Sequence, residues 1–242
     1  MRSCCCIVMG AVGVRWADPM ELITYPDRDL LMMSLADRIA SELGQALRMA
    51  GHASLCVPGG TTPGPVFKTL AEVDLAWRDV AIFLNDERWL GEESPRSNTR
   101  LLKEILLQSK ASVAKLIPLF NGADTPEEGI PDLTDGLLPH LPITVLLLGM
   151  GADMHTASLF PDGDNLNAAL SADAPPLMAM RAANAGEPRI TLTAPVLKAA
   201  LHCHILITGR EKRAALERAA DLPEDQAPIA TVLRTATIHW AE

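Results

Sequence analysis

One segment of the sequence places an acid and a histidine directly after an apolar run. The residues Val145 to Leu148 give way to two glycines, and Asp153 and His155 follow. A histidine titrates near neutral pH and can take a proton from water, and an acid two residues away could orient its ring or hold a substrate. The segment is therefore a candidate catalytic site, although a single histidine here could equally be structural.

A second segment could bind an anion. Gly59, Gly60, Thr61 and Thr62 follow the apolar run Ala53 to Val57. Glycines let the backbone approach a ligand closely, and backbone N–H groups at the start of a helix, with hydroxyl donors, suit an anion. The pattern differs from both nucleotide-binding glycine motifs. A glycine turn with Thr62 as the helix N-cap explains the same residues equally well.

A third polar segment, from Asn85 to Arg88, follows the apolar strand predicted at 79–84. The planar guanidinium of Arg88 suits phosphate, and the carboxylate of Asp86 can accept hydrogen bonds from sugar hydroxyls. Three consecutive charged residues also fit a solvated loop, so this segment alone does not define a site.

Apolar periodicity predicts the elements that position these segments. Strands and helices alternate, which predicts an α/β fold: a doubly wound, mostly parallel, Rossmann-like sheet in a single domain with helices on both faces. Ligands of such sheets bind at the carboxyl ends of the strands, so the three polar segments should share one edge. Glycines and prolines interrupt the helical pattern at 121–142. We expect strands at 53–57, 79–84, 115–119, 143–148, 177–181, 189–193, 204–208 and 235–240, and helices at 27–50, 65–73, 98–107, from Thr156 onward, at 195–200 and at 210–220.

The composition excludes some classes of protein. The chain has 242 residues, 48% of them hydrophobic and 4% aromatic, which indicates a globular protein with an aliphatic core. A net charge of -9 argues against nucleic acid as a partner. Any anionic ligand must therefore meet a local basic pocket.

The cysteines and the N-terminal segment bear on compartment. Five cysteines, three of them adjacent and none in a C-x-x-C pair, favour a reducing cytoplasm over a disulfide scaffold or a zinc site. Residues 4–14 weakly resemble a secretory signal, but they lack a clear cleavage site and are too short to span a membrane. We expect residues 1–19 to be an extension outside the fold, residues 20–242 to form the domain, and no membrane contact. Monomer and dimer both remain open.

Taken together, the polar segments resemble those of the 6-phosphogluconolactonases. The likeness covers about residues 21–240 and rests on "PGGTTP" (58–63), "NDERWL" and "SNTRLL" (85–102), "LGMGADMHTASLFP" (148–161), "PRITLTAPVLKAA" (188–200) and "ITGREKRAAL" (207–216). It implies an enzyme of the pentose phosphate pathway that hydrolyses 6-phospho-D-glucono-1,5-lactone, a sugar phosphate, without metal or organic cofactor.

The same resemblance implies roles for individual residues. The loop from Gly59 to Thr62 would hold the phosphate together with Arg88 and Lys212, and Lys212 is singled out only by the resemblance. His155 would activate water, with Asp153 and Asp86 positioning the histidine or substrate hydroxyls.

The sequence departs from the family pattern at two places in these motifs. Pro58 replaces a serine of the anion loop, and Met154 replaces the glycine between the acid and the histidine. If that position needs a positive φ, methionine costs roughly 1 to 2 kcal/mol in strain.

Two other functions remain open. A glucosamine-6-phosphate deaminase resembles this chain, but it has an additional carboxylate where Phe160 stands here. A non-catalytic sugar-phosphate sensor is the other alternative, and Met154 is its only support. Outside the motifs, His202 and His204 share one strand face without an apparent third metal ligand, so we expect a structural role. Arg189 either joins the site or pairs with a nearby acid.

Overall fold

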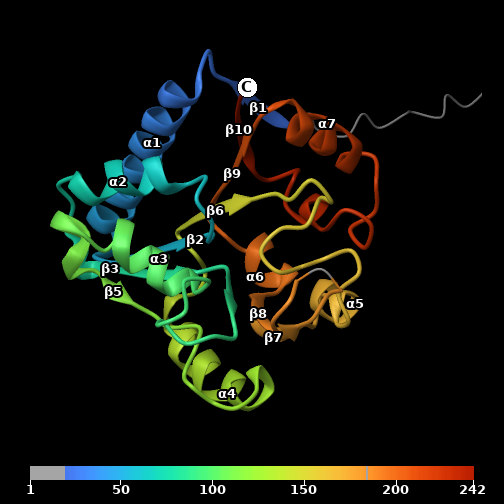
Figure 1. Ribbon diagram of the computed structural model, residues 1–242. Coiled ribbons are helices and arrows are strands. Elements are labelled where there is room, and N and C mark those ends of the chain that lie inside the picture. The colour runs from blue at the N-terminus through green and yellow to red at the C-terminus, as the bar shows by residue number, and fades with distance from the viewer. Residues whose placement is uncertain (1–19, 184) are drawn as a thin grey trace, which may run out of the picture.

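The computed structural model describes residues 20–183 and 185–242, and its centre is a parallel sheet (Figure 1). All neighbouring strands of this sheet run parallel. The first strand lies at one edge, and the chain then crosses to β2 (Ala53–Val57) in the middle and adds strands toward the other edge. It returns to place β6 (Val145–Gly149) on the opposite side of β2, so the strand order reverses between β2 and β6. The predicted α/β fold is confirmed. The strands, in spatial order, are β1 (Glu21–Thr24), β10 (Thr237–Ala241), β9 (His202–Thr208), β6 (Val145–Gly149), β2 (Ala53–Val57), β3 (Val80–Leu84) and β5 (Lys115–Leu116).

Helices cover both faces of this sheet, with α1 and α2 on one side and α7 on the other (Figure 1). The longest, α1 (Arg28–Ala50), buries one apolar stripe that includes Leu35 and Ile39. The Asp27 side chain accepts a hydrogen bond from the Leu30 N–H at 2.8 Å and caps its start, and Gly51, at φ 74°, ends it. The other helices are α2 (Gly64–Glu72), α3 (Asn98–Ile105), α4 (Pro126–Leu137), α5 (Leu166–Leu170), α6 (Ala194–Lys198) and α7 (Arg210–Ala219).

A second, three-stranded sheet packs beside the first. It consists of β4 (Asp86–Arg88), β8 (Arg189–Leu192) and β7 (Leu177–Met180), and both pairs are antiparallel. The sequence predicted the strands at 177–181 and 189–193 but neither their separate sheet nor β4. Strand β4 is three residues long and charged, so only its pairing with β8 makes it a strand.

The helix predicted from Thr156 onward is wrong. Thr156 and Leu159 instead form an isolated antiparallel bridge, and the Thr156 hydroxyl donates to the Gly149 carbonyl at 2.9 Å. Ala157 has φ 49°, which a right-handed helix does not allow. The next helix, α5, begins ten residues after Thr156.

The stretch 121–142 does form a helix, α4, although prolines and glycines interrupt its pattern. Thr125 caps its start by accepting from the Glu128 N–H at 3.3 Å, and Pro126 occupies the first helical position, where its missing N–H costs nothing. Pro131 inside the helix removes a single backbone hydrogen bond.

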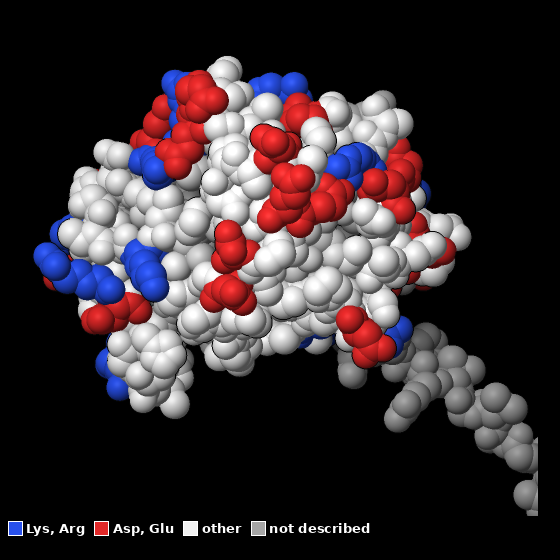
Figure 2. All heavy atoms as spheres, turned by 90° about the horizontal axis from the view of Figure 1, so that it is seen from below, with Lys and Arg blue, Asp and Glu red and all other residues white. Residues whose placement is uncertain are grey.

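Some predictions concern residues outside this description. The N-terminal extension and the three adjacent cysteines lie outside the described residues, while Cys56 and Cys203 are buried free thiols. Among the described residues, no helix combines the length and apolarity needed to cross a membrane. Acidic side chains gather across the face seen in Figure 2, in keeping with the negative net charge.

Candidate active site

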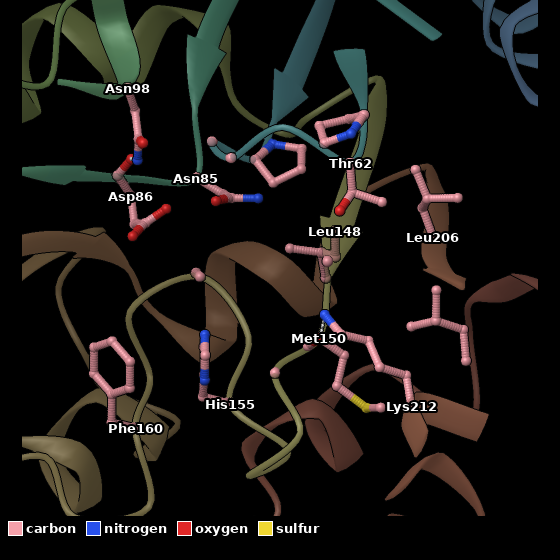
Figure 3. A pocket seen from close by; sticks show the side chains of 18 of the residues that line it. Thr62, Asn85, Asp86, Asn98, Leu148, Met150, His155, Phe160, Leu206 and Lys212 are labelled. Atoms are coloured by element: carbon pink, nitrogen blue, oxygen red, sulfur yellow. Dashed lines mark hydrogen bonds between the residues drawn. The ribbon is translucent and has the colours of Figure 1, made fainter. Parts of the chain in front are cut away.

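A cleft of about 390 Å³ opens at the carboxyl ends of β2, β3, β6 and β9, where the strand order reverses (Figure 3). Ligands of open α/β sheets bind at this point. The cleft brings together most of the predicted site residues, although Thr61 and Asp153 do not line it. The predicted residues in its wall are Gly59, Gly60, Thr62, Asp86, Arg88, His155 and Lys212.

His155 and Asp153 form a hydrogen-bonded pair. The Nδ1 atom of His155 lies 2.6 Å from Oδ1 of Asp153, and this hydrogen bond lowers the pKa of the Asp153 carboxyl. The ionised carboxylate accepts the Nδ1 proton and so leaves Nε2 as the acceptor. In Figure 3 the His155 ring rises from its loop into the cleft beside Phe160, whose ring centroid lies 4.7 Å away. The pair therefore presents an imidazole nitrogen with a free lone pair to the cleft, a group that can accept a proton.

The loop that carries His155 is tightly folded. The Gly151 N–H donates to the His155 carbonyl at 3.0 Å, and the Met154 N–H donates to the Gly151 carbonyl at 3.1 Å. A Cβ atom on Gly151 would lie 2.2 Å from Nδ1 of His155, so only glycine lets the ring fold over the backbone. Met154 has φ 68°, and this bears out the positive φ anticipated at the position.

The glycine loop after β2 is shaped by a neighbouring side chain. A Cβ atom on Gly59 would lie 2.1 Å from Oδ1 of Asn98, so glycine is needed for this close approach. The hydroxyl of Thr62 points into the cleft (Figure 3). The alternative role of Thr62 as a helix cap is wrong, because α2 has Pro63 at its N-cap without a side-chain hydrogen bond.

Buried Glu87 fixes the segment that carries Asp86 and Arg88. Its carboxylate accepts from the backbone N–H groups of Asn98 at 2.9 Å and Thr99 at 2.6 Å, at the start of α3, and from the Thr99 hydroxyl at 2.7 Å. Burial raises the pKa of Glu87, and these hydrogen bonds oppose the rise. The solvated loop considered for residues 86–88 is therefore wrong.

Asp86 lies at the centre of a buried polar cluster. Its Oδ2 accepts from the Ser158 hydroxyl at 2.5 Å and lies 3.7 Å from Nη1 of Arg189. Arg189 is only 8% exposed, and it also lies 4.0 Å from Glu187. Burial lowers the pKa of Arg189, and Asp86 opposes that effect. Arg189 thus both pairs with acids and lines the cleft.

The cationic side of the cleft comes from three basic residues. Lys212, in the first turn of α7, donates from Nζ to the Met150 carbonyl at 2.6 Å (Figure 3). The Arg88 guanidinium donates to the Arg96 carbonyl. The Nε atoms of Arg88 and Arg189 are buried without a protein partner in the described residues, as is Oδ1 of Asn85. The cleft wall therefore combines cationic side chains with polar groups that the described protein does not fully pair.

Three residues of the site had no role in the sequence prediction: Asn85 and Arg189 line the cleft, and Ser158 contacts the lining residue Asp86. Asn85 follows β3 directly, so its place at a strand end could have revealed it. Arg189 was noted without a role, and its pairing with an acid is confirmed. Ser158 gave no signal, because its contact with Asp86 spans 72 residues of sequence.

His202 and His204 lie away from this cleft and contact Glu42 on α1, at 3.6 Å and 2.8 Å. Within residues 20–183 and 185–242, no group of three His, Cys, Asp or Glu side chains is arranged to hold a metal ion.

Comparison with known proteins places this α/β chain in a family. The family model described as "Glucosamine-6-phosphate isomerases/6-phosphogluconolactonase" matches residues 26–240. The chain belongs to this family.

Individual relatives agree with that assignment. The chain is similar to the 6-phosphogluconolactonase of Mesorhizobium japonicum, with 40% identity over 90% of this chain and 93% of the relative. The 6-phosphogluconolactonase of Rhizobium meliloti is 39% identical over 90% of this chain and 97% of the relative. The crystal structure of a 6-phosphogluconolactonase from Shewanella baltica superposes with a TM-score of 0.90 and 33% identity over 93% of this chain and 99% of that one. The resemblance inferred from the motifs is confirmed.

Proposed function

We propose that the chain hydrolyses 6-phospho-D-glucono-1,5-lactone to 6-phospho-D-gluconate, a reaction of the pentose phosphate pathway. The observation that carries the proposal is a single cleft lined by the Gly59 loop, Arg88, Lys212 and His155. The names of the relatives support the same substrate.

The phosphate end of the substrate binds at the glycine loop. The backbone N–H groups of Gly59 and Gly60 and the hydroxyl of Thr62 donate to its oxygens, while Arg88 and Lys212 balance its charge. Anchoring one end of the sugar fixes where the lactone carbonyl lies.

The carbonyl end of the substrate faces His155. Nε2 takes a proton from water as the water oxygen bonds to C1, and the carbonyl electrons move onto its oxygen. When the tetrahedral intermediate collapses, the bond between C1 and the ring oxygen breaks and His155 returns the proton to that oxygen. Asp153 holds the ring through Nδ1. Asp86 and Arg189 contribute acceptors and donors for sugar hydroxyls.

The decisive assay offers the purified protein freshly generated 6-phosphogluconolactone. We expect loss of lactone well above the spontaneous rate, and His155→Ala should return it close to that rate. Equal activity in the variant would remove His155 from the mechanism, and spontaneous hydrolysis with wild-type protein would reject the function.

A parallel assay with glucosamine 6-phosphate tests the deaminase alternative. Phe160, an apolar ring, stands beside His155 where the resemblance gives a deaminase its additional carboxylate. We therefore expect no ammonia release. Ammonia formation at a rate comparable to lactone loss would select the deaminase instead.

A further inference from the structure

A second pocket lies at the opposite edge of the central sheet. Its volume is about 370 Å³, close to that of the active-site cleft, and it opens at the amino ends of β2, β3 and β5. Four connecting segments that are distant in the sequence meet there. Each contributes one basic side chain: His52 before β2, Arg78 before β3, Lys115 at the start of β5, and His140 at the end of the 3₁₀ helix Leu138–His140.

The pocket is mainly basic, whereas the molecule as a whole carries a negative net charge. Arg78 and Lys115 are cations, His52 and His140 can become cations, and Asp79 is the acid in the pocket wall. Among the described residues, neither Arg78 nor Lys115 lies within salt-bridge distance of a carboxylate, and the side chain of Lys115 faces Nε2 of His140 at 3.3 Å. A chain with net charge -9 has many acids that could have paired with these cations.

The basic groups of this pocket also affect one another. The pKa of His140 is lowered mainly by burial, and the charges of Lys115 and His52 lower it further. The pocket thus gathers four basic side chains around one acid, Asp79, and a bound anion would favour the charged forms of these basic groups.

We propose that this pocket is a second ligand site, distinct from the catalytic cleft, and that it takes a small dianionic metabolite such as a phosphate monoester. A dianion placed between Arg78 and Lys115 receives charge-assisted hydrogen bonds from both, and the two histidines supply further donors. The volume exceeds that of a bare phosphate group and leaves room for an organic part of the ligand.

Histidine NMR tests the site, because His52 and His140 report on this pocket while His155 reports on the catalytic cleft. Glycerol 3-phosphate is titrated at pH 7.5, with sodium chloride at matched ionic strength as reference, and the resonances are assigned with His→Gln variants. We expect a saturable shift of the His140 ring resonance that chloride does not produce. Shifts confined to His155, or equal shifts with chloride, would overturn the proposal.

Charge variants localise the binding. Lys115→Ala and Arg78→Ala should each weaken the response of His140 about tenfold, the loss typical of one hydrogen bond to a charged group. Lys68→Ala, which removes an exposed lysine on α2, makes the same change in net charge and should leave binding unaltered. Equal affinity in Lys115→Ala and Lys68→Ala would reject the site. Lactonase activity is measured in all variants, so failure of this proposal is separate from failure of the catalytic one.

Sulfate, which remains a dianion across the titration range of histidine, gives an independent test. Because an anion favours the charged imidazole, saturating sulfate should raise the pH midpoint of His140. An unchanged midpoint would show that no anion lies beside the ring.

Discussion

At the scale of single residues, the proposed chemistry depends on the pair formed by Asp153 and His155. His155→Ala removes the proposed general base, and we expect kcat to fall about 10²- to 10⁴-fold with little change in KM, because in this mechanism His155 acts on the transition state rather than on the bound phosphate. Steady-state kinetics on freshly generated lactone measure both constants. A rise in KM with unchanged kcat would instead assign His155 to substrate binding.

Met154 offers a residue-scale test of strain in the catalytic loop. Its φ of 68° lies where residues with a Cβ are disfavoured. The variants Met154→Gly and Met154→Ala both lose the methionine side chain, so their difference isolates the backbone. We expect Met154→Gly to be more stable than Met154→Ala by about 1 kcal/mol. At a position with negative φ, the alanine variant would be the more stable of the two. Urea unfolding measures the difference, and an alanine variant of equal or higher stability would exclude strain at this position.

At the scale of elements, Glu87 joins β4 to the start of α3. Glu87→Ala leaves the N–H groups of Asn98 and Thr99 buried without their acceptor, and we expect a loss of about 2 to 3 kcal/mol in the free energy of unfolding. Glu104→Ala on the same helix removes an exposed ion pair and should change stability by less than about 0.5 kcal/mol. Equal losses in the two variants would show that Glu87 does not cap the helix.

A buried chain of hydrogen bonds joins three other elements. Tyr25 contacts Nδ1 of His239 at 2.8 Å, Nε2 of His239 lies 3.1 Å from His204, and His204 reaches Glu42 on α1 at 2.8 Å. Burial, followed by His204 and Arg38, lowers the pKa of His239 to about 3. Because the folded value lies below the unfolded value, His239 contributes stability above about pH 6.5 that is lost as the pH falls through 6.5 toward 3.

The buried hydrogen bonds of His239 predict that the stability of the protein depends on pH. Between pH 7.5 and pH 5.0 the wild-type protein should lose about 2 kcal/mol of unfolding free energy to protonation of His239 in the unfolded state. The His239→Gln variant lacks this titrating group, so its fall in unfolding free energy should be smaller than that of the wild type by about 2 kcal/mol. The His52→Gln variant, changed at an exposed site, should show the same fall as the wild type. Urea unfolding at the two pH values measures the loss, and identical losses in wild type and His239→Gln would show that His239 is protonated in the fold.

The elements also show where prediction from the sequence ends. Apolar periodicity is a local signal, so it predicted the long helices and the buried strands of the sheet. The segment after Thr156 looks helical locally but is held open by distant partners: the Ser158 N–H donates to the Thr191 hydroxyl at 3.1 Å and its own hydroxyl to Asp86. Strand β4 exists only through β8. Both failures have one cause, because the contacts that decide these segments are far away in sequence.

At the scale of the whole molecule, the predicted site residues came together because parallel strands share a carboxyl edge. His155, Arg88 and the Gly59 loop are all visible in the sequence as polar residues after apolar runs. Ser158 and the orientation of Arg189 are not, since Arg189 belongs to the second sheet and Ser158 is held by Asp86 and Thr191 of that sheet. The cleft joins the half of the sheet around β2 and β3 to the half around β6 and β9, so a ligand that fills it bridges both.

That bridging predicts a ligand effect on global stability and separates a catalyst from a sensor. The product, 6-phosphogluconate, at 100 times its dissociation constant should stabilise the fold by about 2.7 kcal/mol, which raises Tm by about 5 to 10 °C for a chain of this size. Lys212→Ala should lose most of this shift, because it removes a cation from the phosphate end, while His155→Ala should keep it. Calorimetry with and without ligand measures the shifts. Stabilisation of wild type without lactone turnover would make the chain a sensor, and an unaltered shift in Lys212→Ala would remove the phosphate from the position proposed for it.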